Sequence, residues 1–165
     1  MSKLWYKNYE KGISTEINID NQSTIKDLYV RKIKESRKKT VFKNMGIGLT
    51  YESLNTYSDK LAYYFQKKCG IQKGDHIAIM LLNSLQYHVV ILAAFKVGAV
   101  VVGINPLYTE TELKGQLINS QAKTIIILEN YVDKLLNIRD SIPLDSIIVT
   151  KLGDHLGNIK GSLIN

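Results

Sequence analysis

The sequence predicts an α/β fold in which a mostly parallel sheet is flanked by helices. Short apolar segments alternate with helical segments over residues 76–150, which is typical of parallel strands joined by helical crossovers. The strand segments are continuous apolar runs, which indicates strands covered on both faces. Glycine, proline or helix-capping residues separate most segments from the next.

A first helix is expected to begin near Ser23, after some two dozen polar and irregular residues. Thr24 and Asp27 have the spacing of a capping box, in which each residue satisfies a backbone N–H of the other. The apolar stripe expected on this helix comprises Ile25, Leu28 and Ile33.

A hairpin and a second helix are expected next. Residues 41–44 and 48–50 read as short strands, and the turn over 45–48 contains glycines that tolerate positive φ. The helix starts after Thr50 as N-cap and stops at Gly70. Its expected apolar face comprises Leu54, Tyr57, Leu61, Tyr64 and Phe65.

Four strands and three helices are expected in the α/β region. The strands are placed at residues 76–81, 99–104, 124–128 and 146–150. The first helix runs from Asn83 or Ser84 to about Val97 and is ended by Gly98, the second opens with a Thr109/Glu112 capping box, and the third covers residues 131–139. The order of the strands in the sheet does not follow from the sequence.

A dense basic stretch accounts for much of the formal net charge of +7. One hypothesis is a patch for nucleic acid or anionic lipid. The other, which we favour, is the solvated face and end of a helix, because no nucleic-acid recognition module accompanies the charge. We therefore predict no nucleic-acid partner. The residues are Arg31, Lys32, Lys34, Arg37, Lys38 and Lys39.

Residue types and their spacing identify no catalytic, cofactor-binding or metal-binding position. Cys69 is the single cysteine, and the three histidines are widely separated and lack ligand-like spacing. Gly46 and Gly48 fall in the expected hairpin rather than at a strand-to-helix turn, so they do not form a dinucleotide cradle. Lys160-Gly161-Ser162 has the wrong order for a Walker motif, and no Gly-x-Ser-x-Gly occurs.

The apolar segment 87–104 is expected to be a helix, a glycine stop and a buried strand rather than a membrane span. Lys96 lies at its centre, where a charge would cost about 2.5–3.5 kcal/mol in a bilayer. No secretory signal is recognisable at the N-terminus. We therefore predict a cytoplasmic protein.

Several segments resemble, in order and at matching spacing, the core motifs of the acyl-adenylate-forming superfamily. The segment over 105–113 is close to the Asn-Pro-Leu-Tyr-Thr-x-x-Glu-Leu typical of bacterial long-chain fatty-acid–CoA ligases, which are AMP-forming acyl-CoA synthetases. Further matching positions are Leu49–Leu54 with Ser58, Leu61 and Ala62; Gly74–Met80 with Asn83; Phe95–Val102; Trp5, Tyr9 and Thr15–Ile17; Asn44–Gly46; and Gly153-Asp154 with Lys160-Gly161.

This resemblance implies that residues 1–165 are an incomplete N-terminal part of an AMP-binding (adenylate-forming) domain without an internal boundary. The family forms an acyl-adenylate from ATP and a fatty acid and passes the acyl group to coenzyme A. Its Thr-Gly-Gly-Thr-Thr-Gly-x-x-Lys-Gly phosphate loop, Mg²⁺-binding residues and catalytic lysine lie beyond the matched region. We therefore expect no catalytic, cofactor-binding or metal-binding residue here and no cofactor bound by this segment.

For the full-length family the resemblance implies ATP, Mg²⁺ and coenzyme A, a fatty-acid substrate and peripheral association with the inner face of the membrane. The missing C-terminal portion is then a partner of this segment. Three other hypotheses stay open: a freestanding non-catalytic module that binds a partner or acyl group, the remnant of a decayed gene, and a basic nucleic-acid or lipid-surface binder. Apolar surface left exposed by truncation predicts poor solubility or molten behaviour.

Overall fold

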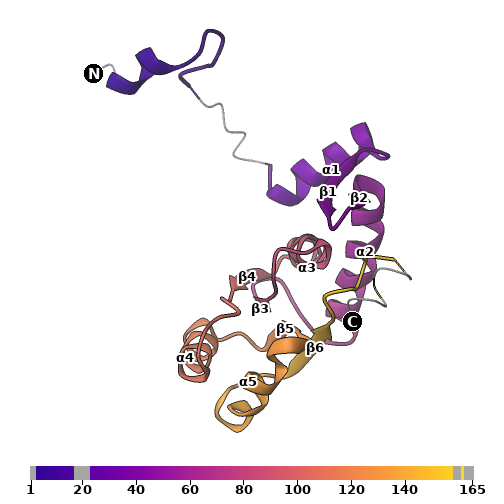
Figure 1. Cartoon of the computed structure of the whole chain (residues 1–165), viewed down its shortest axis with the longest axis vertical. Helices are drawn as coiled ribbons and strands as arrows, with labels where there is room; N and C mark the ends of the chain where they lie inside the picture. The colour runs from indigo at the N-terminus through magenta and orange to yellow at the C-terminus, as the bar shows by residue number, and fades with distance from the viewer. Residues whose placement is uncertain (1–2, 17–22, 158–160, 162–165) are drawn as a thin grey trace.

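The computed structural model describes residues 3–16, 23–157 and 161 (Figure 1). Ile17, Lys160 and Ser162, which the sequence analysis singled out, lie outside these residues. The helices are α1 (Ile25–Ser36), α2 (Tyr51–Lys67), α3 (Leu85–Val97), α4 (Glu110–Ser120) and α5 (Val132–Leu136). The strands are β1 (Thr40–Asn44), β2 (Ile47–Thr50), β3 (His76–Met80), β4 (Val100–Gly103), β5 (Thr124–Leu128) and β6 (Ser146–Thr150). Short 3-10 helices are η1 (Leu4–Asn8), η2 (Glu129–Tyr131) and η3 (Arg139–Ser141).

The expected parallel sheet is confirmed, and its order is β4-β3-β5-β6. All three strand pairs are parallel, with Ala78 opposite Val102 on one side and Ile125 on the other. The chain therefore leaves β3 toward β4 and returns to the other side of β3 to form β5. The direction in which strands are added to the sheet thus reverses between β3 and β5. In open α/β sheets, ligand crevices form at such a reversal.

Two layers of helices cover the sheet. The alternate side chains Ile77 and Ile79 pack with α2 and α3, whereas Ala78 and Met80 pack with α4 and α5. In Figure 1, α2 and α3 lie on one side of the strands and α4 and α5 on the other. Among the described residues, no helix is long and apolar enough to span a bilayer.

The prediction that every strand is covered on both faces is right for the centre of the sheet and wrong for its edges. Four of the five residues of β3 and all five of β5 are buried. The outer strands are partly open, with Val100 of β4 45% exposed and Val149 of β6 49% exposed. Each outer strand has one neighbouring strand within the described part of the chain. Apolar composition alone does not distinguish an edge strand from a central one.

The hairpin and both capping boxes are confirmed. Met45 and Gly46 have φ of 49° and 80°, which suits the tight turn between β1 and β2. Thr24 accepts a hydrogen bond from the Asp27 backbone N–H and donates its own to the Asp27 carboxylate. The same exchange occurs at the start of α4 between Thr109 and Glu112.

The expected apolar faces of the first two helices need correction. On α2, Tyr57 and Tyr64 are exposed, and the buried positions are Leu54, Ser58, Ala62 and Phe65. This face packs against α3, where the Ser58 hydroxyl accepts a hydrogen bond from the Lys96 ammonium. On α1, Ile25 and Leu28 are exposed, and only Ile33 of the expected stripe is partly buried.

Two smaller boundary predictions also change. The single helix expected over residues 131–139 is a short α5 flanked by η2 and η3. Ser84 is the N-cap of α3 as expected, yet its side chain makes no capping hydrogen bond.

Gly98 ends α3 in the left-handed conformation, with φ of 75°. Its N–H donates to the carbonyls of Ala94 and Phe95, and its own carbonyl accepts from the N–H of Gly74. A Cβ at this position would lie 2.9 Å from the Lys73 Cγ. The glycine therefore allows both the turn into β4 and the close approach of the Lys73 loop.

Gly98→Ala is expected to lower the free energy of unfolding by about 1–2 kcal/mol, because L-residues are strained in the left-handed region. Gly115→Ala in the middle of α4 is the matched control. An added Cβ there meets no heavy atom within 4 Å, so this change should stabilise the protein by about 0.5–1 kcal/mol. Urea unfolding followed by circular dichroism measures both, and equal effects of the two substitutions would contradict the analysis.

The open β6 edge is expected to promote association of the chain with itself, since unpaired strand edges template further pairing. Val149→Lys should reduce the aggregated fraction measured by light scattering during slow warming. Ile118→Lys is the control: Ile118 lies on α4 and is 44% exposed, so the substitution adds the same charge away from the strand edge. If both lysines suppress aggregation equally, net charge rather than the strand edge is responsible.

Candidate functional site

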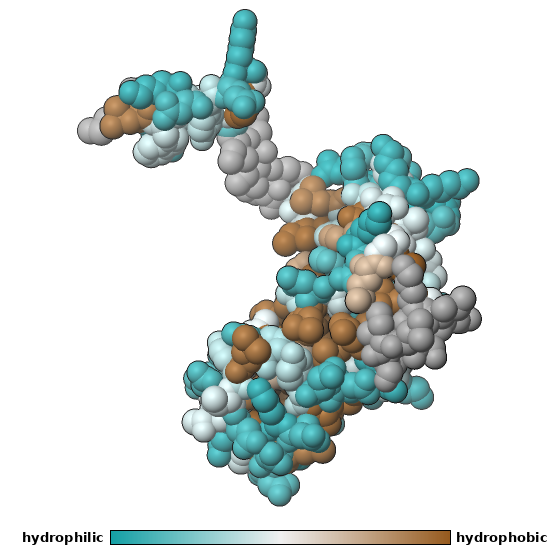
Figure 2. Space-filling model, viewed as in Figure 1, coloured by the Kyte–Doolittle hydropathy of each residue, from teal (hydrophilic) through white to brown (hydrophobic). Residues whose placement is uncertain are grey.

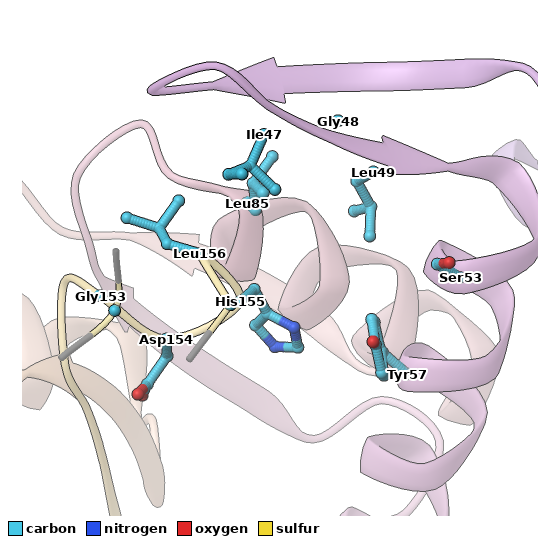
Figure 3. Close-up of a pocket in the computed structure, with 12 residues that line it drawn as sticks. Ile47, Gly48, Leu49, Ser53, Tyr57, Leu85, Gly153, Asp154, His155 and Leu156 are labelled. Atoms are coloured by element: carbon cyan, nitrogen blue, oxygen red, sulfur yellow. The ribbon is translucent and has the colours of Figure 1, made fainter. Parts of the chain in front are cut away.

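A pocket of ≈ 610 Å³ lies where β2, α2 and the start of α3 meet the loop after β6 (Figure 3). Thr50 positions its α2 wall, because the Thr50 hydroxyl accepts the Ser53 backbone N–H at 3.1 Å and starts the helix there. Ser53 and Tyr57, four residues apart, then face the pocket together. Leu49 and Leu85 supply an apolar wall.

The loop after β6 is held by Asp154. The Asp154 carboxylate accepts the Thr150 hydroxyl at 2.6 Å and the Lys151 backbone N–H at 2.8 Å. This turn places His155 in the left-handed region at φ 66°. Gly161 packs against the same loop so closely that a Cβ there would lie 2.8 Å from the Gly153 carbonyl oxygen.

His155 and Tyr57 form the aromatic side of the pocket, with ring centroids 4.7 Å apart. Figure 3 shows the His155 ring pointing toward α2, whereas the Asp154 carboxylate turns back toward its own loop. Burial lowers the pKa of His155, and the negative charge of Asp154 opposes this shift. The imidazole is therefore neutral at pH 7 and offers one donor and one acceptor.

This pocket does not fit the phosphates of ATP. None of its described lining residues is a lysine or arginine, and the one fully charged side chain, Asp154, is negative. Phosphoryl groups require cations and converging backbone N–H donors. The neutral hydroxyl and imidazole groups suit hydrogen bonding to an uncharged polar group. Within residues 3–16, 23–157 and 161, no cluster of three or more metal-ligating side chains occurs.

The carboxyl ends of the parallel strands meet at one edge of the sheet, close to this loop. There the Gln86 amide donates to the Lys151 carbonyl at 2.8 Å and joins the start of α3 to the end of β6. The Ser84 hydroxyl and the Gln86 side-chain carbonyl are buried, and neither has a hydrogen-bond partner in the part of the chain that the structure describes. The turn after β3 contains no glycine, so its backbone forms no phosphate cradle of the dinucleotide-binding type.

Two motif segments that lie far apart in the sequence meet at Lys96. The Lys96 side chain is only 11% exposed, and its ammonium contacts Asn55 Oδ1 at 2.9 Å, Ser58 Oγ at 2.8 Å and Asp59 Oδ1 at 2.6 Å. From the sequence, Lys96 opposes a membrane span and belongs to the motif over Phe95–Val102, and no contact with α2 is predicted for it. Its position in a motif was the signal that could have predicted this network, which joins α2 to α3 and includes none of the residues that line the pocket beside His155.

Several other residues in or beside the motifs make contacts within the scaffold. Asn105 Oδ1 accepts the Leu107 backbone N–H at 3.0 Å and shapes the turn after β4. Lys134 of α5 donates to the Tyr108 carbonyl at 3.0 Å and ties this turn to the far helix layer. His76 is hydrogen-bonded to the Ser120 carbonyl, and His88 stacks on Phe42 at 3.5 Å, where burial lowers the pKa of His88. Both histidines therefore have packing roles. That this segment contains no catalytic, cofactor-binding or metal-binding residue stays a prediction.

Comparison with known proteins identifies the family. The model of the AMP-binding enzyme family matches residues 30–160. The long-chain-fatty-acid–CoA ligase of Escherichia coli O157:H7 is 36% identical over all 165 residues, and that of Haemophilus influenzae is 32% identical over the same length. In both cases the alignment covers 29% of the relative. The resemblance to this ligase family stated from the motifs is confirmed.

Solved structures show the same fold. A long-chain-fatty-acid–CoA ligase from Archaeoglobus fulgidus matches 84% of this chain with a TM-score of 0.69 at 22% identity, and the match covers 29% of that chain. A long-chain-fatty-acid CoA ligase from Rhodopseudomonas palustris gives a TM-score of 0.73 at 19% identity, over 83% of this chain and 37% of that one. With the family model matching most of its length, the chain belongs to the AMP-binding enzyme family.

Proposed function

We propose that this chain supplies the N-terminal scaffold of a long-chain fatty-acid–CoA ligase. The whole enzyme activates a fatty acid with ATP and Mg²⁺ through an acyl-adenylate and transfers the acyl group to coenzyme A. The observation that carries the proposal is the 36% identity to such a ligase across all 165 residues. The chain spans 29% of the length of that relative, so the whole reaction is proposed for the longer protein.

The chain's own residues support a scaffold role. Lys96, Gly98 and the Thr109/Glu112 box fix helices on the sheet, and none of them lines the pocket beside His155. None of the described residues that line the pocket is one of the cations that the developing charge of phosphoryl transfer requires. The segment therefore positions the remaining parts of the domain rather than acting on ATP itself. For the whole protein we propose a location in the cytoplasm, at the inner face of the membrane.

A freestanding non-catalytic module is the second candidate function, and the neutral pocket beside His155 is the observation that favours it. Its hydroxyl and imidazole groups would bind an uncharged polar ligand or an acyl group beside Leu49 and Leu85. A third hypothesis, the remnant of a decayed gene, predicts neither binding nor function.

The purified chain alone is expected to form no acyl-CoA from palmitate, ATP, Mg²⁺ and coenzyme A. Electrostatic stabilisation of the transferred phosphoryl group is the largest part of such catalysis, and no lysine or arginine is among the described residues of the pocket. A coupled assay for AMP release, calibrated with the Escherichia coli ligase, measures this. ATP-dependent acyl-CoA formation by the chain, after contaminating ligase is excluded, would contradict the proposal.

A chimera in which residues 1–165 replace the aligned segment of the Escherichia coli ligase is expected to retain acyl-CoA formation, because the chain contributes packing and no reacting group. The same chimera with Gly98→Val is the control. It should lose soluble, active enzyme, since a β-branched residue is strongly disfavoured at positive φ. A soluble, folded chimera without activity would show that this segment does more than hold the fold.

A further inference from the structure

A groove of ≈ 580 Å³ lies between helix α1, strand β1 and the first residue of α2. None of the residues that line it also lines the pocket beside His155. Five of its lining residues are apolar or aromatic and three, all on α1, are charged. Figure 2, in the same view as Figure 1, shows hydrophobic residues beside hydrophilic ones in the region of α1. The volume falls within the roughly 300–1,000 Å³ of sites that bind small molecules.

The protein core holds the walls of this groove in place. Tyr29, Val41 and Phe42 pack against the buried apolar cluster that β2, α2 and α3 share. The Phe42 ring also stacks on the His88 ring of α3, with centroids 3.5 Å apart and an angle of 4° between the planes. A ligand therefore enters a site whose walls are already ordered, which lowers the entropic cost of binding.

The charged residues of the groove leave one net positive charge. The Lys32 ammonium contacts the Glu35 carboxylate at 3.1 Å, so these two charges balance each other. Arg31 makes no ion pair among the described residues, and the carboxylate of Asp27, one turn before it, is hydrogen-bonded to Thr24. A guanidinium binds a carboxylate through two parallel N–H donors. The groove therefore suits a ligand with a single negative charge, since the Glu35 carboxylate would repel a second one.

Two phenol groups add hydrogen-bonding capacity to the groove. Burial raises the pKa of Tyr29, and the neighbouring phenol of Tyr51 raises it further. The Tyr29 hydroxyl therefore keeps its proton at neutral pH and can donate a hydrogen bond to an anion.

The apolar part of the groove favours a rigid aromatic ligand. Three of its five apolar or aromatic residues carry rings, namely Tyr29, Phe42 and Tyr51, and ring pairs are stabilised beyond the area that they bury. Leu28 is 51% exposed, so this wall of the groove is open to solvent. A flexible chain would lose rotational freedom on such an open surface, whereas a rigid ring system loses little.

We propose that this groove binds a small, rigid aromatic molecule with one negative charge, such as an aromatic carboxylate. The anionic group contacts the Arg31 guanidinium and the Tyr29 hydroxyl, and the ring system lies against Phe42 and Tyr51. The net charge of +7 raises the local concentration of such anions. The inference goes beyond the proposed function, because the ligand is bound without being transformed, at a place separate from the pocket beside His155.

Ligand-observed NMR titration of the full chain with 2-naphthoate tests the groove. A ligand of about a dozen non-hydrogen atoms is expected to bind with a dissociation constant of about a millimolar or below. The uncharged analogue 2-naphthamide should bind about tenfold more weakly, because it lacks the charge that strengthens the hydrogen bonds to Arg31. Decanoate has the same charge and a similar number of atoms, and its flexible chain should make it the weaker ligand.

Two pairs of variants locate the bound ligand. Arg31→Gln is expected to weaken binding of 2-naphthoate by about tenfold and to leave binding of 2-naphthamide nearly unchanged. Its control Lys34→Gln removes the same charge from an exposed position of α1 that does not line the groove, and should bind as wild type. Tyr29→Phe should weaken binding of 2-naphthoate by about threefold, whereas Tyr63→Phe, which removes a hydroxyl from a 64% exposed tyrosine of α2, should not.

Equal affinities for 2-naphthoate and 2-naphthamide would overturn the proposal. Equal losses in Arg31→Gln and Lys34→Gln would do so too, because net charge rather than the groove would then hold the ligand. Tighter binding of decanoate would assign the groove to flexible chains, and a chain that is folded by circular dichroism yet does not bind 2-naphthoate would exclude the site. No measurement uses ligase activity, so these results are independent of the proposed function.

Discussion

The burial of β3 and β5 on both faces is the constraint on which the rest of this structure depends. Their alternate side chains enter two different cores, so one helix layer must cover each face of the sheet. That requirement fixes α2 and α3 on one side and α4 and α5 on the other. It also brings the loops after β3 and β6 to the same edge, where the pocket beside His155 forms.

Local chemistry made much of this fold predictable. Capping boxes and a left-handed glycine act within one turn of the chain, so Thr24, Thr109 and Gly98 could be assigned from neighbouring residues alone. The strands β5 and β6 were placed at their observed bounds because both are uninterrupted apolar runs. Strand order depends on contacts between distant segments and did not follow from the sequence.

The errors have a common cause in tertiary contacts. The buried face of α2 includes Ser58, whose hydroxyl accepts from the Lys96 ammonium 38 positions further along the chain, and a search for apolar residues passes over a polar residue of this kind. The exposed edges of β4 and β6 depend on what lies beside them rather than on their composition. The candidate pocket was not anticipated for the same reason, since His155 and Tyr57 approach only after the loop beyond β6 folds back on α2.

The nearly buried ammonium of Lys96 has a consequence for the specificity of the fold. Apolar helix surfaces can slide along each other at modest cost, because one aliphatic contact replaces another. A slip of α3 by one turn along α2 would instead leave a cation in the helix contact without Asn55, Ser58 or Asp59, and an unpaired buried charge costs several kcal/mol. The network thus favours a single alignment of α3 along α2. It thereby also fixes where the first residues of α3, Leu85 and Gln86, lie at the edge of the sheet.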